Sequence, residues 1–459
     1  MTDDELLALI EAREGESYGY GDGELSEKRA EAIARFLGEP YGDEREGRSQ
    51  VVATDLRDTV LWAMPQLLRV FLGGDELVRF DPRGPEDEQQ AKLETEYINW
   101  LALERNDAFQ HFCTFVQDAL LLGTGYAKVW WDSSEDIQTE TYYGKSDDEI
   151  GMLVNDPDIE VVEHSAYPDP AGSGLYMDPI AGPVPLPAPT LHDVKVKRRY
   201  AEEMAKYAAV PPEELLVHKT VRTGSVQDAA FVEHRRMVTL SELREMGYDI
   251  ADDDFSADDW IDSAEEEARN RYEDEHSEAI DADPSMRRVL YRECYLRVDI
   301  DRDGIAELRK VCIANKKVLH NDEADCVPFA AFSPILFGHR HHGLSFFDLL
   351  AEITAIKTAL LRGMLDSQYL AVQPRTAVDV NRVNLDDMLV SRPGGVVRVN
   401  GDPASATMPL VTPDVGKTAL SGIQYIDAWK QDASGINPYF QGGAMLDSQA
   451  LNKTASGVS

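Results

Sequence analysis

The sequence is short of basic residues. Its 459 residues include 45 lysines and arginines against 84 aspartates and glutamates, which gives a formal net charge of −39 at pH 7. A protein that holds DNA or RNA in a groove needs a basic surface, because it must neutralise phosphates. The chain as a whole offers no such surface, so we do not expect tight nucleic-acid binding. A surface that must not adhere to nucleic acid is compatible with this charge.

Cysteine and long apolar runs are scarce as well. The four cysteines (Cys113, Cys294, Cys312 and Cys326) have neither CxxC nor zinc-ligand spacing, which favours free thiols in a reducing compartment. The first residues, MTDDELLALIEAREGE, lack the basic start and apolar run of a signal peptide. No apolar run approaches the roughly 20 residues that cross a bilayer. We expect a soluble protein, intracellular at synthesis, with no membrane partner.

Recognisable catalytic motifs are also missing, since neither G-x-S-x-G, a Walker loop nor HExxH occurs. The segment GHRHHG supplies His339, His341 and His342, but one short loop cannot easily aim all three at a single ion. No carboxylate or cysteine stands at a useful spacing from them. Catalysis therefore has no visible site, and we do not predict an enzyme.

A run of alternate aspartates stands out in VDIDRDGIAEL, residues 298–308. Asp299, Asp301, Asp303 and Gly304 match positions 1, 3, 5 and 6 of an EF-hand calcium loop, but position 12 is Lys310, which cannot ligate. The flanking residues alternate as strands do, and Asp-Gly is a strong hairpin signal. We predict a hairpin with Asp303-Gly304 at its turn, in which the aspartates are mainly turn and surface residues. No cofactor is expected, and a weakly bound divalent cation is the alternative.

The clearest helix is predicted over residues 346–372. Ser345 and Asp348 have capping-box spacing, and Pro374 ends the helix. At 1.5 Å per residue it is about 40 Å long. A continuous apolar stripe follows its length and requires a long partner surface, from the same chain or a neighbour. The stripe consists of Phe346, Leu349, Leu350, Ile353, Ile356, Leu360, Leu361 and Met364.

The most biased stretch is 251–283, with fifteen acidic residues and two basic ones. It is either a solvated linker or a helix over about 257–280. Strand-like segments dominate 133–250 and 287–338, and another helix is predicted at about 415–433. The chain as a whole is therefore predicted to be α+β.

Seven stretches, in this order, resemble the portal proteins of tailed bacteriophages, especially the short-tailed kind. They are GRSQVVATDLRDTVLWAMPQLLRVF (47–71), DALLLGTGYAKVWWD (118–132), AAFVEHRRMVTLSELREMGYD (229–249), ECYLRVDIDRDGIAELRKV (293–311), GLSFFDLLAEITAIKTALLRGMLDSQYL (343–370), RPGGVVRV (392–399) and LNKTASGVS (451–459).

This resemblance implies a phage portal fold, with a mainly helical wing, a helical stem and a small β-containing clip, assembled as a ring. The implied division begins with an N-terminal wing part at 1–255 and an acidic segment or first stem helix at 256–283. A clip with a β-hairpin follows at 284–341, and a second stem helix at 342–372. Residues 373–459 would form a wing return with the tunnel-loop region, without a C-terminal crown. The tunnel loop itself would be 391–403 or 434–450.

The resemblance also implies partners and a location. The protein would form a homo-oligomer, normally a dodecamer, at one capsid vertex of the virion, after assembly in the host cytoplasm. Double-stranded DNA would pass through it without sequence specificity, packaged by the terminase large subunit and later ejected. Head-tail adaptor and tail proteins would attach to it, and the major capsid and scaffolding proteins would surround it. The alternatives are another ring-forming structural adaptor of the virion, or a metal-dependent enzyme that uses Asp299, Asp301 and Asp303.

In such a ring the helix 346–372 would both line the channel and contact a neighbour. An acidic wall repels DNA and keeps it centred, whereas acids that face outward would only maintain solubility. The channel candidates are Asp348, Glu352, Lys357, Arg362 and Asp366, together with the stretch 251–283. The candidates for the subunit interface are Ile353, Ile356, Leu360 and Leu361.

Overall fold

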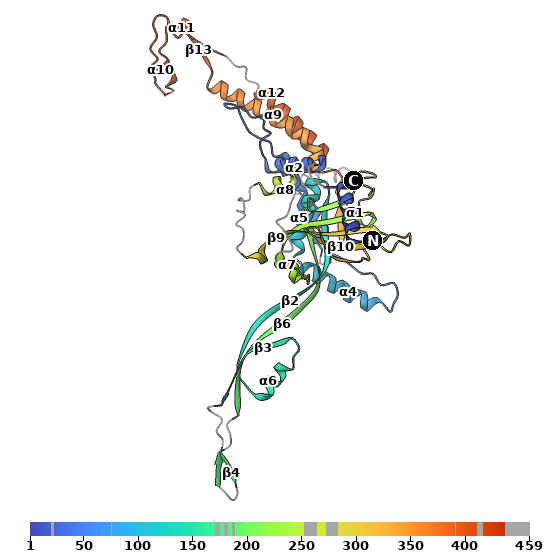
Figure 1. Cartoon of the computed structure of the whole chain (residues 1–459). Helices are drawn as coiled ribbons and strands as arrows, with labels where there is room; N and C mark the ends of the chain where they lie inside the picture. The colour runs from blue at the N-terminus through green and yellow to red at the C-terminus, as the bar shows by residue number, and fades with distance from the viewer. Residues whose placement is uncertain are drawn as a thin grey trace, which may run out of the picture. The chain divides into compact units, whose positions relative to one another are not determined.

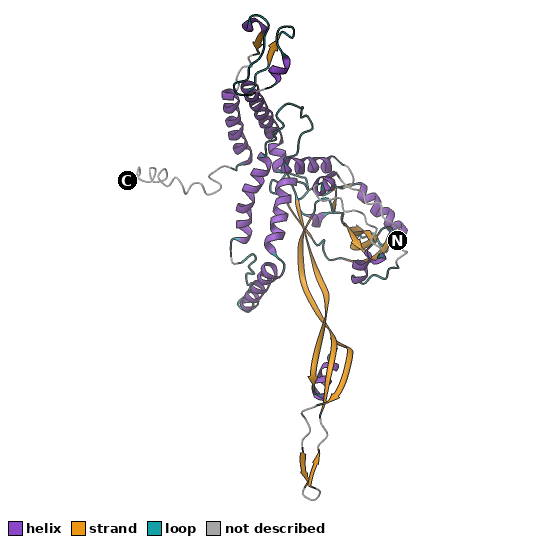
Figure 2. Ribbon diagram, turned by 90° about the vertical axis from the view of Figure 1, so that its left-hand side faces the viewer, coloured by secondary structure: helices purple, strands orange, loops and turns teal. Residues whose placement is uncertain are grey.

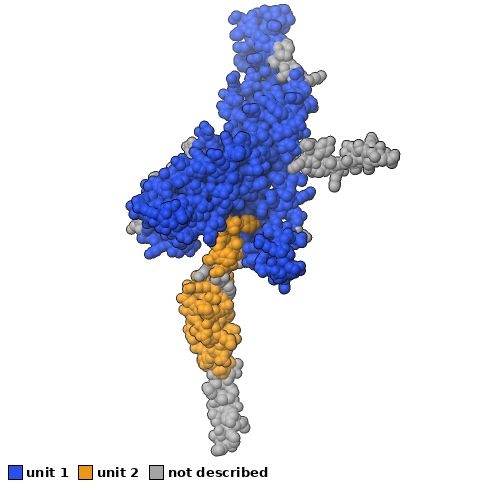
Figure 3. Space-filling view, turned by 90° about the vertical axis from the view of Figure 1, so that its right-hand side faces the viewer, with its two compact units in different colours: residues 1–128, 208–459 blue, residues 129–207 orange. Residues whose placement is uncertain are grey.

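The computed structural model describes residues 1–436 apart from 20–22, 75, 170–174, 179–181, 186–188, 252–263, 272–282, 391 and 411–415 (Figure 1). The chain divides into two compact units, drawn in blue and orange in Figure 3. The first comprises residues 1–128 and 208–459, and the second comprises 129–207.

Helices and strands both contribute substantially, so the predicted α+β class is confirmed. The described helices are α1 Asp3–Gly15, α2 Glu24–Leu37, α3 Asp55–Leu72, α4 Glu88–Trp100, α5 Ala108–Leu122, α6 Asp147–Val154, α7 Leu240–Glu245, α8 Ala264–Asn270, α9 Phe346–Val372, α10 Leu385–Leu389, α11 Pro403–Ala406 and α12 Gly416–Ser434. The described strands are β1 Ser17–Tyr18, β2 Gly125–Lys145, β3 Ile159–Pro168, β4 Leu175–Asp178, β5 Gly182–Pro185, β6 Thr190–Val210, β7 Leu215–His218, β8 Phe231–Thr239, β9 Arg288–Val298, β10 Glu307–Ala314, β11 Lys317–Glu323, β12 Phe329–Phe332, β13 Thr376–Val378 and β14 Thr407–Pro409.

A six-stranded antiparallel sheet in the first unit has the order β1-β7-β8-β9-β10-β11. Because successive strand residues point to opposite faces, Phe231 packs with Leu6 and Ile10 of α1, whereas Val232 packs in another cluster with Tyr126. The sheet is therefore buried on both faces. It also joins strands from the predicted wing, residues 1–255, with strands from the predicted clip, residues 284–341.

A helical core forms the other part of the first unit. Apolar faces of α2, α3, α5, α9 and α12 meet there, with Val60, Leu120 and Leu350 among the fully buried side chains. Burying one such side chain contributes about 1.5–3 kcal/mol. This core holds the beginning of α9, because Phe346, Leu350 and Ile353 all lie within its first three turns.

The second unit is built on the long strands β2 and β6, with β3 beside β6 in the sheet order β12-β2-β6-β3. A complete capping box, formed by Ser146 and Glu149, begins α6. Ile150 of this helix packs against a small cluster that contains Ile159, Val194 and Val196. The unit therefore has its own apolar cluster.

The helices α9 and α12 pack side by side in the first unit (Figures 1 and 2). The chain between them contains the β13–β14 pair and the short helices α10 and α11. We call the described part of it, residues 373–390 and 392–410, the connecting module. The predicted bounds of α9 are confirmed, as is its capping box of Ser345 and Asp348. No helix among the described residues is both long enough and apolar enough to cross a membrane.

Candidate channel-lining helices and their charge clusters

The apolar stripe of α9 is largely used within the chain. Ile353 is buried in the helical core, and Leu360 packs against the same core. Leu361 is half-buried, whereas Ile356 remains 43% exposed. The partner surface that the stripe requires is therefore provided in part by α3, α5 and α12 of the same chain. Of the four interface candidates, Ile356 is the most available to a neighbour.

Lys357 lies in a cluster of four charges that joins α3, α9 and α12. Its Nζ donates to Asp55 Oδ1 at 2.9 Å and to Asp427 Oδ1 at 2.5 Å. Lys430 Nζ donates to the same Asp55 oxygen at 2.6 Å. We call Asp55, Lys357, Asp427 and Lys430 the lysine cluster. It contains two cations and two anions and fixes both long helices to α3.

Two members of the lysine cluster, Asp55 and Lys357, keep their charges over a wide pH range. Burial opposes the charged form of Asp55, but hydrogen bonds from Lys430 and Lys357 outweigh it and lower the pKa of Asp55 below its ordinary 3.8. Burial likewise opposes the charge on Lys357, yet Asp427 and Asp55 raise the pKa of Lys357 above its ordinary 10.5. Asp55 and Lys357 therefore both remain ionised near neutral pH.

Arg362, five residues after Lys357 on α9, is held by the segment that connects α2 and α3. Its guanidinium donates to Asp43 at 2.8 Å and to Val51 O at 2.9 Å, and it also pairs with Glu44. Burial tends to raise the pKa of Glu44, but the Tyr41 and Gly42 N–H groups and Arg362 lower it to about 2. Both basic residues of α9 are thus bonded to two carboxylates each.

A pocket of about 420 Å³ lies between α9 and this segment. Ala355, Ala359 and Gly363 supply its small-residue wall on α9, and Arg45 and Arg48 line it from the segment. Its size follows from these small side chains, which leave space where larger ones would fill it.

The three acidic channel candidates differ in their surroundings. Asp348 accepts from Ser345 in the capping box and pairs with Lys28 of α2 at 2.5 Å. Asp366 accepts from the Ser49 N–H at 2.7 Å. Glu352 is exposed. Two of the three therefore have structural partners within the chain.

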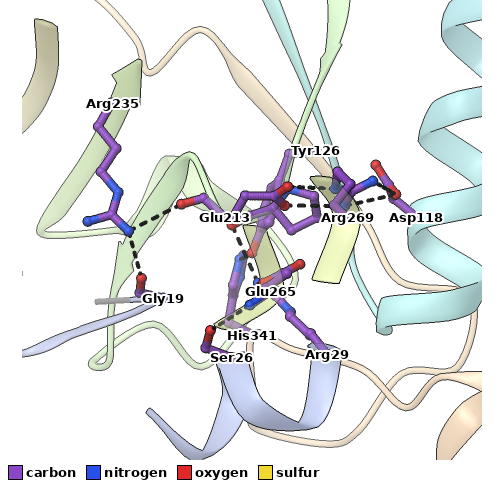
Figure 4. Close-up of polar contacts among 11 residues, drawn as sticks. Gly19, Ser26, Arg29, Asp118, Tyr126, Glu213, Arg235, Glu265, Arg269 and His341 are labelled. Atoms are coloured by element: carbon purple, nitrogen blue, oxygen red, sulfur yellow. Dashed lines mark hydrogen bonds and ion pairs between the residues drawn. The ribbon is translucent and has the colours of Figure 1, made fainter. Parts of the chain in front are cut away.

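The described part of the acidic stretch 251–283 is anchored in the body of the first unit. It consists of α8, whose Glu265 and Ala268 are buried, with residue 251 and the flanking residues 271 and 283; residues 252–263 and 272–282 lie outside the description. Arg29 of α2 donates to Glu265 at 3.3 Å (Figure 4). Arg269 donates to Glu213 at 2.6 and 3.2 Å and, at a longer 3.4 Å, to Asp118 of α5.

We call this second cluster the α8 network; it consists of Arg29, Asp118, Glu213, Glu265 and Arg269. The α8 network contains three carboxyl groups but only two guanidinium groups. Glu213 takes the shortest bonds from Arg269. Burial raises the pKa of Asp118 to about 6 and that of Glu265 to about 7, against the opposing effect of the arginines. The network therefore takes up a proton more readily than isolated carboxyl groups do.

A family model described as phage SU10 portal protein matches residues 6–459. The chain belongs to this family. The match confirms the resemblance to phage portal proteins and establishes a portal channel role in phage DNA packaging. Portal proteins of this family are structural proteins. No curated protein matches the chain.

In this portal protein the aspartate loop lies between β9 and β10, so the predicted hairpin is confirmed, as are the strand flanks. Its turn is longer than predicted and occupies residues 299–306, because the Asp299 carboxylate folds back to accept the N–H groups of Arg302, Asp303 and Gly304 at 2.6, 3.1 and 2.8 Å. Carboxylate oxygens of Asp299, Asp301 and Asp303 lie within 4.8 Å of one another. Backbone donors already satisfy much of this negative charge.

The three histidines of the loop before α9 have different partners, although the rings of His341 and His342 contact each other edge to face. His341 is buried, and its Nδ1–H donates to Thr223 O at 3.2 Å. Its Nε2 then accepts from the Tyr126 hydroxyl at 3.0 Å. Burial lowers the pKa of His341, which favours this neutral form. His342 contacts the Tyr18 ring edge-on, and His339 is exposed.

Sequence reasoning missed the partners that surround the two cations of α9. Asp55, Asp427 and Lys430 carried no local motif, and neither did Asp43 and Glu44. The available signal was indirect: a basic residue within an apolar helical stripe requires a carboxylate partner when it is buried.

Proposed function

We propose that copies of this chain assemble into a closed ring, normally a dodecamer, that conducts double-stranded DNA at one capsid vertex. The observation that carries the proposal is the pair α9 and α12, which packs as one unit and connects through the connecting module. Cyclic assembly with one heterologous interface repeated around an axis closes such a channel.

We further propose that α9 and α12 form the stem and that residues 373–415 form the clip. Two observations support this division over the one derived from the sequence. The described part of 256–283 packs on α2, not along α9. The strands of 284–341 belong to the six-stranded sheet, together with strands from the N-terminal region. Residues 1–345 then contribute most of the wing.

The connecting module is suited to contacts with other proteins. Exposed apolar side chains are frequent in it, including Leu389, Val390, Val396 and Met408. Arginines and aspartates are balanced over 375–410, with four of each, in a chain whose net charge is −39. We propose that the connecting module binds neighbouring copies, the terminase large subunit and head-tail adaptors one after another. Major capsid and scaffolding proteins would contact the wing, during assembly in the host cytoplasm.

The assembly is tested by images of the purified protein viewed down the particle axis, together with sedimentation across a wide concentration range. We expect closed rings with a central hole. A protein that stays monomeric at the highest concentration contradicts the proposal. A ring that does not bind terminase indicates another ring-forming adaptor.

Ile356→Asp tests the part of α9 assigned to the interface. Ile356 is exposed in the single chain, so the substitution leaves the subunit folded but places a charge in an apolar seam of the ring. We expect a shift toward monomers, with thermal unfolding of the monomer unchanged. Ile356→Val, the control, keeps the ring. Rings of normal stability with Ile356→Asp would show that the interface lies elsewhere.

A further inference from the structure

The long helix α9 contains two basic residues, Lys357 and Arg362, and both are enclosed. The Lys357 side chain is 16% exposed and the Arg362 side chain 14% exposed. Each bonds to two carboxylates from outside α9, which come from α3 and α12 in one case and from residues 43–44 in the other.

We propose that Asp43 and Glu44, with Asp55 and Asp427, mask the cations of α9, so that duplex DNA in the channel meets no free cationic side chain on this helix. The inference rests on the proposed function, because it requires that α9 lines a channel for DNA. It assigns a role to carboxylates that lie outside the helix itself.

Masking follows from the arithmetic of charge. A phosphate that approaches Arg362 must compete with two carboxylates already bonded to the guanidinium, and the group of three has a net charge of −1. The lysine cluster as a whole is neutral. A free cation would instead release counterions from DNA and hold it, and each phosphate neutralised steepens the salt dependence by about 0.9. A ring repeats that effect in every subunit.

Stability alone does not account for the pairing around Arg362. Asp43 is 72% exposed, and exposed ion pairs contribute little to folding, about 0–1 kcal/mol. Glu44 receives two backbone N–H groups as well as Arg362, at 2.9 Å from Tyr41 and 2.8 Å from Gly42. This segment therefore holds one carboxylate firmly in place over Arg362. Because the pKa of Glu44 lies at about 2, its charge persists at every physiological pH.

The test compares two ring variants that lose the same charge. Asp43→Asn with Glu44→Gln unmasks Arg362. The matched control, Glu352→Gln with Asp432→Asn, removes one exposed acid from α9 and one from α12 but leaves both cations masked. Retention of linear duplex DNA is measured on assembled rings between 50 and 200 mM salt. We expect about tenfold greater retention at 50 mM salt and a steeper salt dependence for the unmasked ring than for the control.

Adding Arg362→Gln to the unmasked variant identifies the cation responsible, and retention should return to the control value. Equal retention by the unmasked and control rings overturns the masking role, and so does high retention that persists after Arg362→Gln. If Asp43→Asn with Glu44→Gln does not assemble, Asp427→Asn removes one of the two carboxylates that bond to Lys357, and its DNA retention is compared with that of Asp432→Asn. Greater retention by Asp427→Asn supports the masking role, and equal retention overturns it. Failure of the wild-type chain to form rings refutes the proposed function instead, and imaging detects it before any DNA is added.

Discussion

Two ion clusters of the first unit, the lysine cluster and the α8 network, differ in charge balance. The lysine cluster pairs two cations with two anions at 2.5–2.9 Å. The α8 network sets two guanidinium groups against three carboxyl groups, and its outer contacts are 3.3–3.5 Å long. The charges of the lysine cluster balance, whereas the α8 network has one excess negative charge that a bound proton can neutralise.

The difference shows that burial alone does not decide how an acidic residue titrates. Asp55 and Glu265 are both almost fully buried. Two lysines lower the pKa of Asp55, whereas burial and an excess of carboxyl groups raise the pKa of Glu265 to about 7. The clusters also hold different elements, since the first ties α9 and α12 to α3, and the second ties α8 to α2 and α5. We therefore expect the long helices to keep their attachment across neutral pH and the attachment of α8 to vary.

Breaking the balanced cluster should have the largest effect. Asp55→Asn leaves Lys357 and Lys430 without their shared carboxylate, and loss of one partner from a buried ion pair costs about 3–5 kcal/mol. We expect the free energy of unfolding to fall by about that amount in chemical denaturation. The control is Asp58→Asn on the same helix, where the carboxylate contacts Thr54 at 3.5 Å and the expected loss is below about 1 kcal/mol. Equal losses for both variants would show that the cluster does not hold the helices.

Proton uptake by the α8 network should give the next largest effect. The folded-state pKa of Glu265 is raised from 4.5 to about 7, so its contribution to stability is greatest below pH 4.5 and is lost as pH rises toward 7. At 1.36 kcal/mol per pKa unit the difference is on the order of 3 kcal/mol. Asp118, raised from 3.8 to about 6, acts in the same direction. Docking of α8 should therefore weaken between pH 4.5 and 7.

Glu265→Gln separates this effect from general pH dependence. The variant has no proton to lose at this position, so hydrogen exchange of α8 should become slower relative to wild type as pH rises through that window. Comparison at each pH removes the intrinsic pH dependence of exchange. Glu267→Gln, on the exposed side of the same helix, should follow wild type. A wild-type-to-Gln ratio that stays constant from pH 4.5 to 7.5 would contradict proton-dependent docking.

The sequence predicted the elements whose signals are local. The capping box at Ser345 and the apolar stripe defined α9 to the residue, and the alternation around the aspartates defined the hairpin of β9 and β10. The charge clusters have no local signal. Lys357 is separated from Asp55 by 302 residues and from Asp427 by 70, so a sequence pattern cannot pair them.

The position of the described part of the acidic stretch 251–283 also depends on contacts that are distant in the sequence. Its composition is typical of a solvated linker, and a helix was the alternative. In the described part, α8 is a helix of seven residues, and the placement of Glu265 against Arg29 depends on an arginine 236 residues away. Composition predicts the behaviour of the stretch as a whole, whereas tertiary contacts bury individual residues of it, such as Glu265.

The aspartate loop extends the comparison to a cluster with carboxylates alone, and here we expect the smallest effect. Asp299 accepts three backbone N–H groups, Asp301 accepts that of Asp303 at 3.2 Å, and Asp303 accepts that of Ile305 at 2.7 Å. These N–H groups supply the positive ends of dipoles where the other clusters have lysine or arginine. Burial tends to raise the pKa of Asp299, but the N–H groups of Arg302, Asp303 and Gly304 lower it below its ordinary value.

Calorimetric titration with calcium should therefore reveal no site tighter than about 10⁻⁴ M, the weak range of extracellular modules. Asp301→Ala should leave that titration and the hairpin unchanged, because neighbouring backbone groups still bond to Asp299. A micromolar calcium site that Asp301→Ala abolishes would show that the three carboxylates act together as ligands, and that charge in this loop is balanced by an ion.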